Sequence, residues 1–312
     1  QGRQSILFLN RRGFSHFFHC RTCGYEMRCK HCSVGMTYHK ERDLMVCHYC
    51  GYRVRPVTQC PDCGSFDVGY SGFGTERIEE DLAARFPEWR IARIDTDSVR
   101  RKGALEEVIT SFRDGETDVL LGTQMVAKGL NFPGVKLVGI ILADTGLHMP
   151  DFRAAERTFS LVVQVAGRAG RFHPDGHVIV QSYAPENPAI SRALEHDLEG
   201  FYRTELTARE ELAFPPYARL IRLVVRSRRA EHARDAVAAL ADACRSRLQS
   251  AEEILGPSEC PLAVISGNTR HQVLVRTNRF GPTHEELAAL LPGLSLPNDC
   301  HLEIDVDPVS LL

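Results

Sequence analysis

Four Cys-x-x-Cys pairs within residues 20–63 constrain this 312-residue chain more than any other feature. The pairs are Cys20/Cys23, Cys29/Cys32, Cys47/Cys50 and Cys60/Cys63. Each Cys-x-x-Cys turn directs two thiolates at one tetrahedral ion, so two turns complete a four-thiolate shell. The chain opens without a recognisable secretory signal, which favours metal over disulfides. We therefore expect two structural zinc ions.

The spacing of the pairs does not decide which pairs share an ion. Nested pairing places Cys20, Cys23, Cys60 and Cys63 on one zinc and Cys29, Cys32, Cys47 and Cys50 on the other. We expect nesting because it closes the segment at both its base and its tip, although sequential and interleaved pairings stay open. A redox dithiol or an iron–sulfur cluster is the alternative chemistry. Nearby histidines are expected at the surface rather than on metal: His16, His19, His31, His39 and His48.

Charge is distributed unevenly along the chain. The net charge is −2, yet residues 1–58 hold ten Lys or Arg and only three Asp or Glu. A local basic field attracts polyanions, and tyrosines interleaved with these basic residues suit the stacking of unpaired bases. A solvated basic face is an equal alternative. The longest apolar run, residues 135–143, is interrupted by Lys136 and is far shorter than the roughly 20 residues of a membrane span, so no membrane partner is expected.

Hydrophobic periodicity predicts two kinds of fold in the rest of the chain. Strand-like runs at 5–10, 91–94, 119–123, 135–142 and 178–181 alternate with helical patterns, which predicts an α/β domain with a parallel sheet. A single helical stretch is expected from about 188 to 213. Beyond it, the order β-α-β-β-α-β predicts a small α+β domain of the ferredoxin-like plan, whose second strand is expected at 262–265.

These patterns predict three structural parts. The α/β domain is formed by residues 1–13 and 71–185, and the cysteine-rich segment 14–70 is inserted into it as a zinc-binding module. Insertion at a loop is tolerated because the ends of a surface loop lie close together. Residues 186–312 form the C-terminal domain.

The stretch Gln164-Val-Ala-Gly167-Arg168-Ala-Gly170-Arg171 is the most specific candidate for chemistry. Its two arginines lie three residues apart, and its glycines allow close approach of the backbone. Such arginines suit contact with the γ-phosphate of a nucleotide, where they stabilise the transferring phosphoryl group as arginine fingers. A buried structural ion pair is the alternative for either arginine alone.

This stretch resembles the sixth signature motif of superfamily 2 helicases, and residues 122–133 resemble their fifth. Asn10-Arg11-Arg12-Gly13 before the cysteine pairs, and Gly74-Thr75-Glu76 after them, resemble the family of primosomal replication-restart helicases. The resemblance runs nearly end to end. It implies that the α/β domain is the second RecA-like lobe of a 3′–5′ DNA helicase, and that the C-terminal domain and zinc module bind DNA and primosome partners.

The resemblance also implies roles for single residues. Arg168 and Arg171 meet the ATP phosphates, and Gln164 couples that contact to DNA. Gly129 and Asn131 lie at the nucleotide, with Asn131 where related helicases touch the ribose. The implied DNA-binding residues are Thr123, Lys128, Arg11 and Arg12.

A phosphate-binding loop is missing from the sequence. None of the five lysines follows a glycine, and no Asp-Glu dipeptide occurs, whereas a P-loop ATPase needs Gly-x-x-x-x-Gly-Lys-[Ser/Thr] and a carboxylate pair for Mg²⁺. ATP and Mg²⁺ are therefore expected to bind with a first lobe that this chain lacks, and the chain alone is expected to be inactive. It is either a fragment or a degenerate homologue.

The predicted function is thus part of an ATP-dependent DNA helicase that recognises stalled or branched forks and starts primosome assembly for replication restart. The expected partners are forked and single-stranded DNA, primosome proteins and single-strand-binding proteins, and the expected state is a monomer in the bacterial cytoplasm, associated with the nucleoid. The alternative is a non-catalytic, zinc-containing DNA-binding scaffold that recruits replication proteins.

Overall fold

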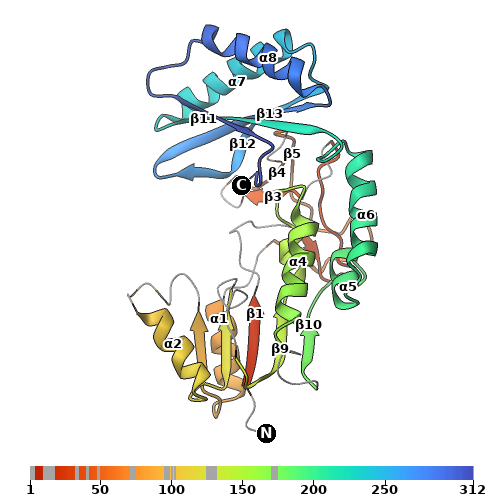
Figure 1. The fold of residues 1–312 in the computed structure, drawn as a ribbon, viewed down its shortest axis with the longest axis vertical. Coiled ribbons are helices and arrows are strands. Elements are labelled where there is room, and N and C mark those ends of the chain that lie inside the picture. Colours follow the sequence, from red (N-terminus) through yellow and green to blue (C-terminus); the bar gives the residue numbers. More distant parts are fainter. Residues whose placement is uncertain are drawn as a thin grey trace.

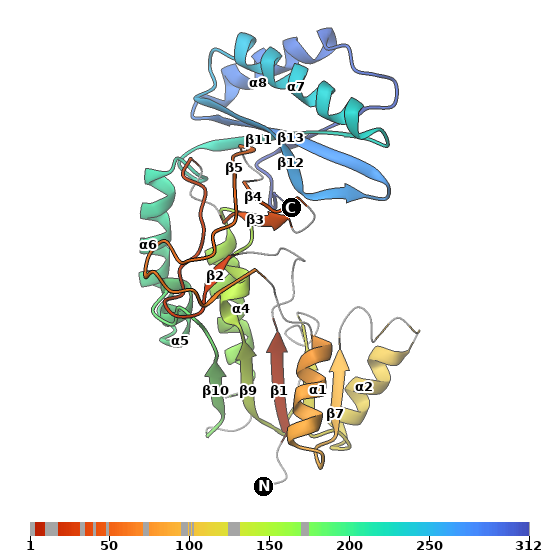
Figure 2. The same cartoon turned by 180° about the vertical axis from the view of Figure 1, so that it is seen from behind.

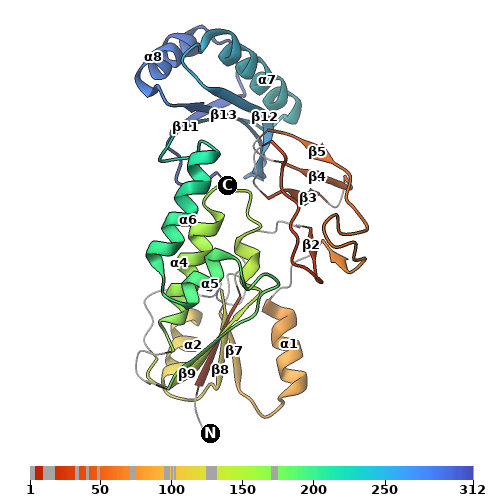
Figure 3. The same ribbon diagram turned by 90° about the vertical axis from the view of Figure 1, so that its right-hand side faces the viewer.

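The chain forms three regions along the long axis of the molecule (Figure 1). The computed structural model describes residues 4–9, 18–31, 35–39, 42–47, 50–70, 75–94, 99, 101, 103–123, 132–169 and 175–311. We call the described parts of residues 4–9 and 75–211 the α/β lobe, those of 18–70 the cysteine module, and those of 219–311 the C-terminal domain. The cysteine module lies beside the other two regions at their junction (Figure 3).

A parallel sheet forms the centre of the α/β lobe. Its described strands are β1 (Gln4–Leu9), β7 (Ile91–Ile94), β8 (Val119–Gly122), β9 (Val135–Ile141) and β10 (His177–Val180), in the order β10-β9-β1-β8-β7. Every neighbouring pair is parallel. All four residues of β8 are buried, as expected for a strand covered on both faces. The predicted α/β fold is confirmed.

Helices cover both faces of this sheet. They are α1 (Thr75–Arg85), α2 (Ala104–Arg113) and α4 (Ala154–Ala166), with the short 3₁₀ helix η1 (Ala143–Gly146) after β9. Seen along the sheet, α1 lies on one face, and α2 and α4 lie on the other (Figure 3). Buried side chains on α4 recur at helical spacing, at Phe159, Val162 and Val165, so the helix turns one face to the core of the lobe.

Two further helices, α5 (Pro188–Leu194) and α6 (Leu198–Glu211), pack beside α4. The sequence predicts one continuous helix here, but the chain breaks at His196, whose φ is +56°. Asp197 then caps α6 by accepting a hydrogen bond from the Gly200 N–H at 2.9 Å. The rings of Phe159 and Phe201 stack at 4.1 Å, which fixes α6 against α4.

Very short strands give the cysteine module its shape. β2 (His19–Cys20) pairs with β6 (Val68–Gly69), and β3 (Thr37–His39), β4 (Leu44–Val46) and β5 (Arg53–Val54) form a second small sheet. Strands of two or three residues bury little apolar surface. The module therefore depends on contacts beyond its own strands, including the apolar cluster that it shares with the C-terminal domain.

The C-terminal domain has an antiparallel sheet with two helices. Its elements are β11 (Arg219–Ser227), α7 (Ala230–Arg247), β12 (Glu253–Ile265), β13 (Asn268–Thr277), α8 (Phe280–Leu290), η2 (Leu291–Gly293) and β14 (His301–Val306). The sheet order β12-β13-β11-β14, with antiparallel neighbours, confirms the ferredoxin-like plan. However, β12 begins at Glu253, nine residues before the expected strand at 262–265, because bulges near Pro257 and Pro261 interrupt its alternating pattern.

Apolar packing joins the cysteine module to the C-terminal domain. Met45 and Cys47 of the module lie in one buried cluster with Leu220, Leu274 and Leu311 of the C-terminal domain. The two regions also share a salt bridge, in which Arg42 Nη1 lies 2.7 Å from Glu259 Oε2. Hydrophobic burial and charge pairing therefore fix the module against this domain.

The core of the α/β lobe generates a stability prediction. Leu120, on β8, is fully buried, whereas Ile179, on β10 of the same sheet, is 60% exposed. We expect Leu120→Ala to lower the free energy of unfolding of the lobe by about 2–5 kcal/mol, since it leaves a cavity. Ile179→Ala should change it by less than about 0.5 kcal/mol. Urea unfolding followed by the fluorescence of Trp89, the single tryptophan, which lies between α1 and β7, measures both; equal losses would contradict the assigned core.

Candidate metal centres and the arginine-bearing helix

The first cysteine cluster contains Cys20, Cys23, Cys60 and Cys63, whose sulfurs all lie within 4.8 Å of one another. The Cys20–Cys63 and Cys23–Cys60 sulfurs are 3.6 Å and 3.7 Å apart. A disulfide requires about 2.05 Å, whereas four sulfurs at about 2.3 Å from a zinc ion are about 3.8 Å apart. The cluster therefore fits a tetrahedral ion.

The second cluster contains Cys29, Cys47 and Cys50, with 3.6 Å between the Cys29 and Cys50 sulfurs. The remaining cysteine expected here, Cys32, lies outside the described residues. Nested pairing predicts that the described cysteines group in this way. The structure brings residues 20–23 beside 60–63, and Cys29 beside 47–50.

Glycines after the second cysteine shape three of the four turns. In the turn at Cys60, the Gly64 N–H donates to the Cys60 carbonyl at 3.0 Å, and the Cys60 N–H donates to the Ser65 carbonyl at 2.8 Å. The turns at Cys20 and Cys47 repeat this pattern. Gly24, Gly51 and Gly64 have φ values of +74°, +76° and +72°, a conformation that favours glycine.

Electrostatics in the first cluster favour a bound cation. Burial raises the pKa of the Cys20 thiol, but hydrogen bonds from the backbone N–H groups of Cys23 and Thr22 lower it to about 6. For Cys23, a backbone hydrogen bond from Tyr25 lowers the pKa, but desolvation and the three neighbouring sulfurs raise it to about 12. The negative charge of one thiolate thus disfavours ionisation of the neighbouring thiols, and a bound divalent cation offsets this repulsion.

The histidines of the module differ in their surroundings. His31 is exposed and His39 half-buried, but His19 is only 5% exposed, so the expected surface position is wrong for His19. Its ring packs 5.5 Å from that of Tyr183 and occupies the space that a side chain at Gly69 would fill. The described cysteine clusters contain none of these three histidines, and His16 and His48 lie outside the described residues.

Helix α4 carries the arginine motif at its carboxyl end. Gln164 is exposed in the last turn, and the Gly167 N–H continues the helical hydrogen bonding by donating to Val163 at 3.0 Å. Arg168 follows in a further turn, where its N–H donates to the Val165 carbonyl at 3.1 Å, and its side chain is half-buried. The structure thus places Gln164 and Arg168 at the same end of α4.

The carboxyl edge of the sheet carries the other candidate residues. Thr123 directly follows β8 and is half-buried, and its N–H donates to the Ile94 carbonyl at 3.3 Å. Because parallel strands share one carboxyl edge, β1 and β7 end on the same side of the sheet as β8 (Figure 2). The candidates that lie outside the described residues are Arg11, Arg12, Lys128, Gly129, Asn131 and Arg171.

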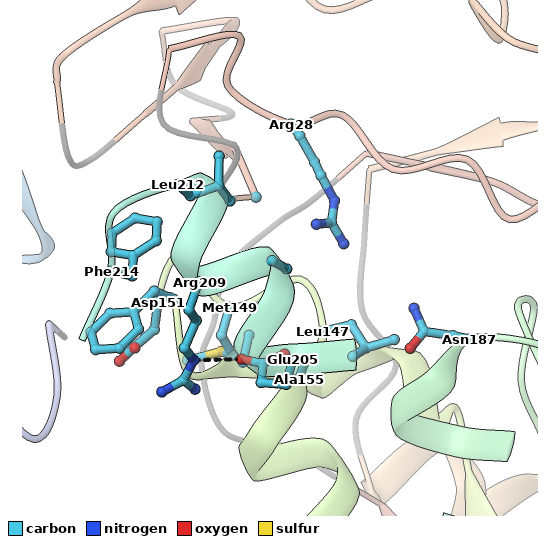
Figure 4. A pocket seen from close by; sticks show the side chains of 14 residues that line it. Arg28, Leu147, Met149, Asp151, Ala155, Asn187, Glu205, Arg209, Leu212 and Phe214 are labelled. Atoms are coloured by element: carbon cyan, nitrogen blue, oxygen red, sulfur yellow. Dashed lines mark hydrogen bonds and ion pairs between the residues drawn. The ribbon is translucent and has the colours of Figure 1, made fainter. Parts of the chain in front are cut away.

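Sequence reasoning missed a group of buried charges at the junction of the three regions. Asp151 is 3% exposed and Arg209 is 8% exposed. Both line a cavity of about 120 Å³, together with Glu205 and with Arg28 of the cysteine module (Figure 4). This volume is well below the roughly 300–1,000 Å³ of a cofactor site, so the cavity is too small for a nucleotide. Arg209 pairs with Glu156 and Asp151 accepts a hydrogen bond from Leu311, and these partners are too distant in sequence for a local pattern to mark them.

Comparisons with known proteins identify each region. The family model described as the helicase conserved C-terminal domain matches residues 73–173, the PriA DNA helicase Cys-rich region matches 29–55, and the primosomal protein N C-terminal domain matches 210–309. An α/β helicase lobe with this cysteine-rich insertion and this C-terminal domain defines the class of primosomal helicases.

Relatives extend the match over the whole chain. Replication restart protein PriA of Treponema pallidum is 50% identical over 311 residues, which cover 100% of this chain and 47% of that protein. The Bacillus subtilis protein of the same name is 43% identical over 93% of this chain and 36% of its own length. The chain belongs to the PriA family of replication restart proteins, and it spans less than half the length of these bacterial relatives. Among its described helices, none is long and apolar enough to cross a membrane.

The close approach of the cysteine module to the lobe generates a second prediction. A Cβ at Gly24 would lie 2.8 Å from the Tyr183 carbonyl oxygen, at a φ of +74°. We expect Gly24→Ala to destabilise the zinc-loaded protein by about 1–3 kcal/mol and to speed zinc release to a chromophoric chelator. Gly281→Ala, on α8 with nothing within 4 Å of its Cβ, should leave both unchanged. Equal behaviour of the two variants would contradict this placement of the turn.

Proposed function

We propose that this chain forms the second RecA-like lobe, the zinc module and the C-terminal domain of an ATP-dependent 3′–5′ DNA helicase. The complete protein would recognise stalled or branched forks and start primosome assembly in the bacterial cytoplasm. One observation carries the proposal: α4 ends in the Gln164–Arg171 motif, within the residues that match the helicase C-terminal domain. Gln164 and Arg168 lie at the same end of α4, and we propose that this end faces a second lobe.

Arg168 and Arg171 are proposed to donate hydrogen bonds to phosphate oxygens of ATP. A guanidinium there stabilises the negative charge that spreads over the phosphoryl oxygens during transfer. Gln164, exposed one turn before Arg168, is proposed to link this contact to the DNA-binding surface. ATP and Mg²⁺ would be held mainly by the first lobe, since this sequence contains no phosphate-binding loop. Gly129 and Asn131 are proposed to approach the nucleotide, as the helicase motif implies.

The cysteine module is proposed to hold two zinc ions in the nested arrangement. Four thiolates per ion close the coordination shell, so the zinc supplies folding free energy, on the order of 10 kcal/mol per site, rather than catalysis. Sulfur separations near 3.6 Å in both clusters support this proposal. The fourth ligand of the second site would be Cys32.

DNA is the proposed partner of the carboxyl edge of the sheet and of the cysteine module. Thr123 and Lys128, with Arg11 and Arg12, are proposed to contact the DNA backbone, because all four follow strands of this edge. Primosome and single-strand-binding proteins are the proposed protein partners, and we propose a monomer. The alternative is a non-catalytic scaffold, which predicts no ATP hydrolysis by the complete protein.

The arginine assignment can be tested in the complete protein. We expect Arg168→Ala to lower DNA-stimulated ATP hydrolysis by about 10³-fold or more, since it removes charge stabilisation in the transition state. Forked-DNA affinity should stay within about twofold, because the partner of Arg168 is phosphate of ATP. Arg113→Ala, at an exposed position on α2, is the matched control. Lost DNA affinity with normal ATP hydrolysis would overturn the assignment, and no hydrolysis by the wild-type protein would favour the scaffold.

The zinc arrangement predicts the behaviour of single cysteine variants. Cys29→Ser and Cys47→Ser should each lose one of two zinc ions, since both ligate the same site. Cys20→Ser should lose the other, and Cys300→Ser, outside the described clusters, should lose none. Zinc per chain, measured by atomic emission after gel filtration, gives the counts. Different counts for Cys29→Ser and Cys47→Ser would contradict nested pairing.

A further inference from the structure

The chain segment after β14 crosses back to the α/β lobe and contacts the start of α4. Arg153 Nη1 donates to the Pro308 carbonyl at 3.1 Å, and Arg157 Nη2 donates to the Val309 carbonyl at 2.7 Å. Both arginines belong to the first turn of α4 or directly precede it. Two carbonyls of the C-terminal domain are therefore held by the helix that carries the arginine motif at its other end.

A buried carboxylate organises this contact. The side chain of Asp151 is fully buried, and its Oδ2 lies 2.9 Å from Arg157 Nη1. The same oxygen accepts a hydrogen bond from the Leu311 N–H at 3.2 Å, and Oδ1 accepts one from the Arg153 N–H at 3.0 Å. A buried charge is tolerated only when it is paired and hydrogen-bonded. Asp151 thus binds the backbone of Arg153, the residue that precedes α4, pairs with Arg157 and holds the chain after β14. We call Asp151, Arg153, Arg157 and residues 308–311 the α4 clamp.

The clamp also reaches the cysteine module. Leu311 is fully buried in the cluster that contains Cys29 and Cys47, and Arg222 Nη1 donates to the Ser310 carbonyl at 3.3 Å. Residues 308–311 are therefore anchored on one side in the C-terminal domain and the module, and on the other side at α4. A shift of either region acts directly on the first turn of α4.

Helix α4 can carry such a shift to its far end. It has 13 residues, or about 20 Å at 1.5 Å per residue, and Arg168 follows its last turn. Near the clamp, Arg209 Nη2 lies 2.7 Å from Glu156 Oε2. The cavity of about 120 Å³ beside Asp151 and Arg209 leaves room at this junction (Figure 4). Polar contacts thus hold the start of the helix, and the cavity lies beside these contacts.

We propose that the α4 clamp positions Arg168, so that DNA bound by the cysteine module and the C-terminal domain stimulates ATP hydrolysis through α4. Asp151, Arg153 and Arg157 are positioning residues, since they act through the helix and touch neither nucleotide nor DNA. The proposal rests on the proposed function, which supplies the reaction. It assigns coupling to residues that lie outside the helicase motifs.

Arg157→Gln in the complete protein tests the clamp. We expect ATP hydrolysis without DNA and forked-DNA affinity to stay within about twofold of wild type, and the stimulation of hydrolysis by DNA to fall about fivefold or more, the size of a typical coupling. Arg192→Gln is the matched control, because the ion pairs of Arg192 with Glu195 and Asp197 stay within the α5–α6 turn. DNA should stimulate ATP hydrolysis by Arg192→Gln as strongly as by the wild type. A proportional loss of basal and stimulated rates in Arg157→Gln would show a merely structural role and overturn the proposal.

Two further measurements separate the clamp from its surroundings. Arg153→Gln should reduce stimulation in the same way, and the double variant Arg153→Gln/Arg157→Gln should lose less than the product of the two effects, because both arginines hold one segment. Hydrogen exchange of α4 amides needs no ATP. Forked DNA should change exchange in the last turn of α4 in wild type but not in Arg157→Gln. An identical change in both proteins would overturn the clamp, whereas absent hydrolysis in wild type would overturn only the proposed function.

Discussion

Mutual repulsion among clustered thiolates is the constraint on which the junction of this molecule depends. Four sulfurs within 4.8 Å cannot all ionise without a cation, and the strands of the cysteine module are only two or three residues long. Beyond the metal, the module is ordered by the apolar cluster and the salt bridge that it shares with the C-terminal domain. Because its inner side chains share a buried cluster with Leu274 and Leu311, the metal indirectly orders the surface against which the C-terminal domain packs.

The core of the α/β lobe and the start of α4 are stabilised by different physical means. In the lobe, fully buried side chains such as Phe8, Leu120 and Val138 give non-directional apolar packing. At the junction, Asp151 and Arg209 are satisfied by directional polar contacts. Apolar packing resists displacement of the strands, whereas hydrogen bonds to carbonyls define one geometry at the start of α4. This contrast makes the lobe a rigid support and the junction a defined point of connection.

The sequence predicts the parts of this structure that depend on local pattern. The alternation of strands and helices and the order of the C-terminal elements follow from spacing and periodicity. The grouping of Cys20 with Cys63 follows instead from the expectation that nesting closes the inserted segment at its base. The burial of His19 could not be predicted, since it depends on the space left by Gly69 in a neighbouring strand. The roles of Arg11, Lys128, Asn131 and Arg171 stay predictions, since they lie outside the described residues.

The α4 clamp could not be predicted either, because it also depends on contacts between segments that are distant in the sequence. Arg153 and Pro308 are 155 residues apart, and the acceptor is a backbone carbonyl, which carries no residue-specific signal. A site that is completed by a second lobe requires its arginines to arrive in register with groups that this chain does not contain. An element that fixes the amino-terminal end of the arginine-bearing helix helps to hold the arginines in that position. The elements that do so here are the cysteine module and the C-terminal domain, the same regions proposed to contact DNA. Under the proposed function, helix α4 therefore connects the regions proposed to contact DNA with the arginine motif proposed to contact ATP.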